Sequence, residues 1–166
     1  RRLGADGVVF GCLTADGEVD LTSMQILMEA SKGLSVTFHR AFDVCRNPQK
    51  ALEEIIELGC NRILTSGQQP TAEQGIGLLK ELQGLAAGRI TLLADCGVNE
   101  NNIARIAAET GINEFHFSAR ESIQSEMKFR NEVVSMGGTV HINEYERNVT
   151  SVRRVKETVE ALYKGM

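Results

Sequence analysis

The feature that most constrains this chain is a strand-and-helix unit that occurs five times in sequence. Short apolar runs with strand character begin at residues 7, 36, 62, 90 and 114, and amphipathic helical patterns fill the intervals between them. A strand followed by a helix at this spacing is typical of βαβ units, which place successive strands parallel in one sheet. The repeat therefore predicts an α/β protein with a parallel sheet.

The interval after the second run shows how clearly the helices are marked. Asn47-Pro48 places an N-cap residue before a proline at the first helical position. Leu52 and Ile55 then begin an apolar face at helical spacing. A last helix is expected over residues 151–164, which carry valines and a leucine at the same spacing.

Two architectures fit five such units. One is a doubly wound five-stranded sheet, and the other is part of a TIM (β/α)8 barrel, which needs about 250 residues for eight units. The chain has 166 residues and opens on RRLGADGVVFG, which reads like the end of a helix running into a strand. We expect a single domain over residues 1–166 that represents strands four to eight of a TIM barrel, with the first three units outside this sequence. The lack of a GxGxxG motif after any strand agrees with the barrel.

Composition excludes several classes of partner. The net charge is −4 and the isoelectric point is near 5.5, so no basic surface for nucleic acid or an anionic membrane is expected. An apolar run of about 18 residues, which a transmembrane helix needs, is not found. The four cysteines (Cys12, Cys45, Cys60 and Cys96) form no CxxC pair, which predicts reduced thiols in a cytosolic protein.

The first candidate site is the polar group that follows the strand VTFHRAFD. Ligands of parallel α/β proteins bind at the carboxyl ends of the strands, where His39, Arg40 and Asp43 are expected. His39 is a candidate general base, with Arg40 and Asp43 as the groups that position it. The same three residues also fit an ionic network that braces the rim of the barrel, and the sequence supports both interpretations equally.

The second candidate is an anion site after the last two strands. TIM barrels commonly bind phosphate there through backbone amides and the N-terminus of a helix. Gly97 precedes an expected helix start with Asn99 as its N-cap, while Ser118 and Arg120 follow the last strand. The alternative is an empty turn with a surface arginine. The long segment that follows, residues 121–148, fits either a lid or a solvated stretch.

A metal site is the third candidate. Cys12, Cys45 and Cys96 all lie near expected strand ends, and Cu(I) prefers thiolate ligands. The histidines and cysteines show no paired or helix-spaced ligand motif of the zinc type. The three thiols are therefore candidate metal ligands on their position alone.

Four motifs, in order along the whole chain, resemble the CutC copper homeostasis family: VTFHRAFD (36–43), RILTSG (62–67), EFHFSAR (114–120) and MKFRN (127–131). The resemblance implies a TIM barrel and a role in copper homeostasis through Cu(I) binding. It also suggests an animal-like member with cytosolic or nuclear placement. The family usually has a glycine-rich turn where this chain reads Asp95-Cys96-Gly97, and these side chains weaken the anion site and favour a metal.

The residues leave a second function open, that of a TIM-barrel enzyme acting on a small anionic or phosphorylated metabolite at the carboxyl ends of the strands. With either function we expect a homo-oligomer. An open five-unit sheet exposes two edges, and exposed sheet edges promote association.

Overall fold

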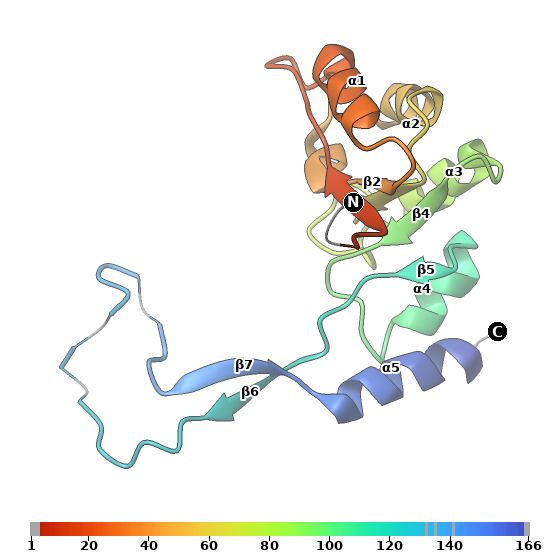
Figure 1. Ribbon diagram of the computed structural model, residues 1–166. Helices are drawn as coiled ribbons and strands as arrows, with labels where there is room; N and C mark the ends of the chain where they lie inside the picture. Colours follow the sequence, from red (N-terminus) through yellow and green to blue (C-terminus); the bar gives the residue numbers. More distant parts are fainter. Residues whose placement is uncertain (1–3, 132, 135, 141, 165–166) are drawn as a thin grey trace.

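The computed structural model describes residues 4–131, 133–134, 136–140 and 142–164. Its centre is a parallel sheet with the strand order β1-β2-β3-β4-β5 (Figure 1). The strands are β1 (Gly7–Phe10), β2 (Ser35–Phe38), β3 (Arg62–Thr65), β4 (Thr91–Ala94) and β5 (Glu114–Phe115). Each begins within one residue of the position that the repeat predicts, so the expected α/β sheet is confirmed.

Helices separate the strands as expected. They are α1 (Leu21–Ala30), the 3-10 helix η1 (Arg40–Val44), α2 (Pro48–Glu57), α3 (Ile76–Ala86), α4 (Ile103–Thr110) and α5 (Val152–Lys164). The side chain of Asn47 accepts a hydrogen bond from the amide of Lys50 at 3.0 Å, which confirms the predicted cap of α2. Within the described ranges, no helix combines the length and the apolar character that crossing a membrane requires.

The strand order distinguishes the two architectures. A doubly wound sheet reverses its order at a switch point, whereas here each strand pairs in parallel with the next one along the chain. Val36, Ile63 and Leu92 are buried on one face of the sheet, in a core shared with α1 to α4. On the other face, Thr37 and Leu93 are only half-buried. Sequential parallel strands with helices on one side form part of a TIM barrel.

A second sheet was not predicted. Strands β6 (Arg120–Gln124) and β7 (Glu146–Thr150) pair antiparallel and form a two-stranded ribbon. Figure 1 shows this ribbon reaching away from the rest of the molecule, while α5 returns to lie beside α4. We call the described residues between 120 and 150 the arm, and the remainder the body. The segment expected as a lid or solvated stretch is thus this ribbon and the loop that it carries.

Candidate functional site

The carboxyl ends of β2 and β3 are joined by a polar network centred on Asp43. The carboxylate of Asp43 accepts hydrogen bonds from Arg40 Nε at 2.6 Å and from the hydroxyl of Thr65 at 2.6 Å. It also accepts from the backbone amides of Ser66 at 3.0 Å and Gln68 at 3.2 Å. Thr65 and Ser66 are fully buried, so Asp43 satisfies polar groups that water cannot reach.

Local structure explains why Arg40 and Asp43 meet. They lie three residues apart in η1, and a 3-10 helix has three residues per turn, so their side chains project from the same side. The Asp43 side chain is 7% exposed and that of Arg40 is 40% exposed. The hydrogen bond to Asp43 raises the pKa of the Arg40 guanidinium above its ordinary value, which burial partly opposes. The pair is therefore a fixed charge arrangement at this edge of the sheet.

Arg40 connects the network to the segment that follows β4. Its Nη2 donates to the hydroxyl of Ser66 at 3.0 Å, and its Nη1 donates to the Sγ of Cys96 at 2.6 Å. Burial and the neighbouring Asp95 raise the pKa of the Cys96 thiol, and Arg40 opposes that shift. Three consecutive strand ends are thereby connected through one guanidinium.

The backbone at these strand ends takes up an uncommon conformation. Gln68, Cys96 and Ala119, which follow β3, β4 and β5, have φ angles of 56°, 73° and 45°. Residues other than glycine rarely adopt positive φ, and such positions cluster at functional sites. The side chain of Gln68 is held by a hydrogen bond to the carbonyl of Cys45 at 2.7 Å.

A pocket of about 300 Å³ opens beside this network. Its walls come from the segments after β4 and β5: Asp95, Cys96, Gly97, Val98, His116, Phe117, Ser118 and Arg120. The three residues predicted as an anion site, Gly97, Ser118 and Arg120, therefore line one pocket. The helix expected to begin near Asn99 starts later, because α4 begins at Ile103 with Asn102 as its N-cap.

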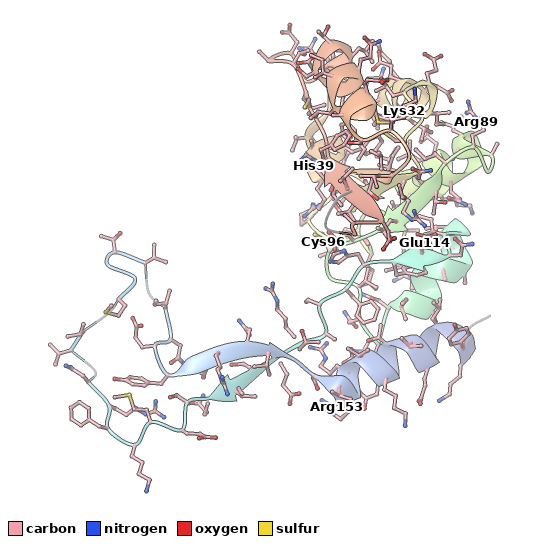
Figure 2. The ribbon with its side chains drawn as sticks, in the orientation of Figure 1. Lys32, His39, Arg89, Cys96, Glu114 and Arg153 are labelled. Carbon is pink, nitrogen blue, oxygen red and sulfur yellow. The ribbon has the colours of Figure 1, made fainter. Side chains whose placement is uncertain are left out.

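His39 follows β2 as the N-cap residue of η1 and lies next to the end of β1. Its Nδ1 accepts a hydrogen bond from the amide of Ala41 at 3.2 Å and lies so close to Gly11 that an added Cβ there would be 2.8 Å away. Gly11 follows β1, whereas Arg40 and Asp43 face β3 and β4. The structure brings Arg40 and Asp43 together and places His39 next to the neighbouring strand end. Figure 2 shows His39 and Cys96 on the left, where strands end, and Lys32, Arg89 and Glu114 on the right, where strands begin.

The predicted thiols lie in three different surroundings. Cys96 lines the pocket, Cys12 follows β1 and is half-buried, and Cys45 is buried after η1. Burial raises the pKa of Cys45 to about 11, and the Nε2 of Gln68 donates a hydrogen bond to its sulfur at 3.4 Å. Among the described residues, no three His, Cys, Asp or Glu side chains lie together in a way that would hold a metal ion. The structure does not gather the three cysteines into one ligand set.

The pocket nevertheless contains two donors that suit a soft ion. The thiol of Cys96 and the imidazole of His116 both line it, and thiolate and imidazole are established copper ligands. The guanidinium of Arg120 and the hydroxyl of Ser118 line the same pocket and suit an anion. The arrangement can therefore bind a soft cation through two donors or an anion through another two.

Sequence reasoning did not assign a role to His116, Thr65 or Ser66. His116 and Ser118 lie two and four residues after Glu114. Alternate residues of a strand lie on the same face, so this spacing could have indicated that His116 accompanies Ser118. Thr65 and Ser66 gave no such signal, because their partner Asp43 is more than 20 residues away in sequence.

Comparison with known proteins gives consistent results. The sequence model of the CutC family matches residues 1–121. The family protein CutC of Bacteroides thetaiotaomicron is 76% identical over 162 residues, which are 98% of this chain and 65% of that protein. The family protein CutC of Porphyromonas gingivalis is 48% identical over 162 residues, 98% of this chain and 65% of the relative. The chain thus spans about two thirds of the length of these curated relatives, slightly less in each case.

A solved structure supports the fold. The crystal structure of CutC from Streptococcus agalactiae, described as a candidate copper homeostasis protein, matches with a TM-score of 0.66 and 32% sequence identity. The match covers 69% of this chain and 57% of that one. The relatives named above are bacterial, so they give no support to the animal-like source suggested by the sequence motifs.

Proposed function

This chain belongs to the CutC family, and on that premise we propose that it serves copper homeostasis by holding Cu(I) as cargo in the pocket at the ends of β4 and β5. The observation that carries the proposal is the presence of Cys96 and His116 in the walls of one pocket. Cu(I) accepts few ligands and prefers soft ones, so a thiolate and an imidazole suffice. Arg40, held by Asp43, fixes the position of the Cys96 sulfur.

An anaerobic titration of the reduced protein with Cu(I) against a competing chelator tests this proposal. We expect Cys96→Ser and His116→Ala each to weaken Cu(I) binding by at least about tenfold, or 1.4 kcal/mol. Cys60→Ser is the matched control, because Cys60 is buried away from the pocket with its sulfur 3.8 Å from the sulfur of Met28. A loss of affinity in Cys60→Ser but not in Cys96→Ser would assign the copper to that sulfur pair and contradict the proposal.

A second function is favoured by a different part of the same pocket. Arg120 and Ser118 offer a guanidinium and a hydroxyl to an anion, and His116 and Asp95 supply groups that can transfer protons. This set fits an enzyme that acts on a small anionic metabolite. In this alternative Arg40 and Asp43 brace the strand ends. His39, which lies next to the neighbouring strand end, is the candidate general base.

Thermal melting with inorganic phosphate, pyrophosphate and citrate tests the second function. A ligand at 100 times its dissociation constant stabilises the folded state by about 2.7 kcal/mol. We expect Arg120→Gln to abolish that stabilisation, while Arg153→Gln on α5, where the side chain pairs with Glu157, leaves it intact. Equal stabilisation of both variants would place the anion elsewhere.

We further propose that the chain is a single domain with five of the eight units of the barrel, that it acts in the cytosol and that it forms homo-oligomers. All four cysteines are free, as expected for a reducing compartment. Nuclear placement rested on the animal-like source and loses its support with it.

A further inference from the structure

We propose that Arg154 on α5 is a positioning residue of the pocket, because it joins the two walls between which a ligand binds. One wall is the segment after β4, which includes Gly97, and the other is the segment after β5, which includes Arg120. The inference rests on the proposed function only in that the pocket binds a ligand, whether Cu(I) or an anion. It names a residue outside the pocket that determines how firmly that ligand is held.

The two walls lie beyond the point where β4 and β5 are paired. The strand register ends with Ala94 opposite Phe115, and the amide of His116 then donates a hydrogen bond to the carbonyl of Ala94 at 2.9 Å. Within the described chain, this is the last backbone hydrogen bond between the two segments. The separation of the walls therefore depends on side chains.

Arg154 supplies this connection. Its Nε donates to Oε1 of Glu100 at 3.0 Å and its Nη2 donates to Oε2 at 3.1 Å, so the ion pair is bidentate. Its Nη1 donates to the carbonyl oxygen of Arg120. Glu100 follows the first wall and Arg120 belongs to the second, so one guanidinium holds both walls. The hydrogen bonds from Arg154 lower the pKa of the Glu100 carboxyl, which keeps the pair charged at neutral pH.

The turn between Gly97 and α4 relates Glu100 to the wall of the pocket. The carbonyl of Gly97 accepts hydrogen bonds from the Nδ2 of Asn99 at 2.7 Å and from the Nδ2 of Asn102 at 2.9 Å. The Oδ1 of Asn102, which is a buried residue, accepts from the amide of Asn99 at 2.8 Å. Glu100 lies inside this closed turn, so a displacement of Glu100 moves Gly97 as well.

Helix α5 gives Arg154 a fixed base. The side chains of Arg154 and Glu100 are only 27% and 21% exposed. The buried hydroxyl of Thr158 donates to the carbonyl of Arg154 at 2.7 Å and lies 3.5 Å from Oε2 of Glu100. Immediately before the helix, the amide of Ser151 donates to the carbonyl of Ala119 at 3.0 Å. Ion pairs between mobile surface side chains lack such supports.

Alkylation of Cys96 by iodoacetamide, followed by mass spectrometry, tests the inference without any ligand. Cys96 lines the pocket, so its rate of reaction reports how often the walls separate. We expect Arg154→Gln to make Cys96 react at least about fivefold faster, because the walls open more often. Arg40 and Asp95, which act on the pKa of the Cys96 thiol, stay in place in this variant.

Arg153→Gln is the matched control. Arg153 precedes Arg154 on α5 (Figure 2) and pairs with Glu157 of the same helix, so its loss should leave the rate at Cys96 unchanged. Glu100→Gln is a milder second variant, because the amide keeps the shape of the side chain, and it should also raise the rate. In the double variant of Glu100 and Arg154 the two effects should add to less than their sum, as expected for residues that act as a pair.

Two other thiols are internal references in every sample. Cys12 is half-buried after β1 and Cys60 is buried in the core, and both should react at unchanged rates. An unchanged rate at Cys96 in Arg154→Gln would overturn the inference. A parallel rise at Cys60 would also overturn it, because the pair would then stabilise the whole fold and not the pocket.

Titration of the same variants with Cu(I) separates this inference from the proposed function. We expect Arg154→Gln to weaken Cu(I) binding about tenfold and Arg153→Gln to leave it unchanged. If Cys96→Ser does not alter Cu(I) binding, the proposed function fails, and the alkylation rates still decide the role of Arg154. If Cu(I) binding depends on Cys96 but not on Arg154, the inference fails alone.

Discussion

The body and the arm use the same kinds of residue in opposite ways. Phe38 in the body is fully buried between the sheet and its helices, whereas Phe129 in the arm is 70% exposed. In the body, the core residues follow a strand or helix period, and the chain itself supplies the elements that cover them. In the arm, apolar residues have no such period. The comparison teaches that apolar residues at a regular period become buried only where the same chain also supplies the element that packs against them.

The largest effect that tests this comparison comes from a matched pair of truncations. Phe38→Ala should destabilise the protein by about 3–5 kcal/mol, because it removes a fully buried ring and leaves a cavity. Phe129→Ala should change the free energy of unfolding by less than about 0.5 kcal/mol, as is usual at exposed positions. Urea unfolding at one fixed protein concentration measures both values. Similar losses in the two variants would mean that the arm and the body form one packed unit.

The second test removes the centre of the polar network. Asp43→Ala should cost about 2–3 kcal/mol, because it leaves the hydroxyl of Thr65 and the amide of Ser66 buried without their acceptor. Asp16→Ala is the control, since the Asp16 carboxylate is 82% exposed and lies 3.9 Å from Arg46. The control should stay within about 0.5 kcal/mol of the unmodified protein. An equally small effect in Asp43→Ala would show that the network does not hold the strand ends.

The sequence was sufficient to predict the body but not the arm. The spacing of the five apolar runs predicted every strand of the sheet, because local alternation and cap residues such as Asn47 act over a few residues. The register and the burial of one face then follow from the βαβ connection. The ribbon of β6 and β7 has polar strands separated by more than 20 residues, so neither a tight turn nor a hydrophobic period indicated it.

The candidate site was predicted in part for a similar reason. Gly97, Ser118 and Arg120 were recognised by their place after strands, and the fold brings such places together. The meeting of Arg40 with Asp43 depends on η1, which begins directly after β2 with His39 as its N-cap residue. A 3-10 turn of five residues leaves no periodic trace, so the sequence could not show which of the three polar residues would meet.

The third test uses pH to probe burial in the body, where all four thiols lie. Burial raises the pKa of Cys60 from 9.0 to about 11. Below pH 9 the thiol is protonated in both the folded and the unfolded chain, so it adds no pH dependence. Between pH 9 and pH 11 the unfolded chain releases the proton and the folded chain keeps it, so stability falls as the pH rises.

We expect this loss to amount to about 1–2 kcal/mol for Cys60 by pH 11, somewhat below the full value of two pKa units. Comparison of urea unfolding at pH 8.5 and pH 10.5 in the unmodified protein and in Cys60→Ala isolates the contribution. The variant should lose less stability over that interval. Parallel losses would show that the buried thiol ionises as readily as an exposed one.

The smallest effect concerns the arm alone. Tyr145→Phe keeps the ring beneath Arg130 but removes the hydroxyl that accepts from the amide of Asn131. The same hydroxyl donates a longer hydrogen bond to the carbonyl of Asn131 at 3.3 Å. The loss of both contacts should lower the local stability of the arm around Asn131 by about 1 kcal/mol, which makes amide exchange at Asn131 about fivefold faster. Tyr163→Phe on α5 is the control, since Tyr163 is 72% exposed. Global unfolding should be unchanged in both variants, because the arm opens independently of the body. A lower global stability in Tyr145→Phe would show that the two regions unfold as one cooperative unit.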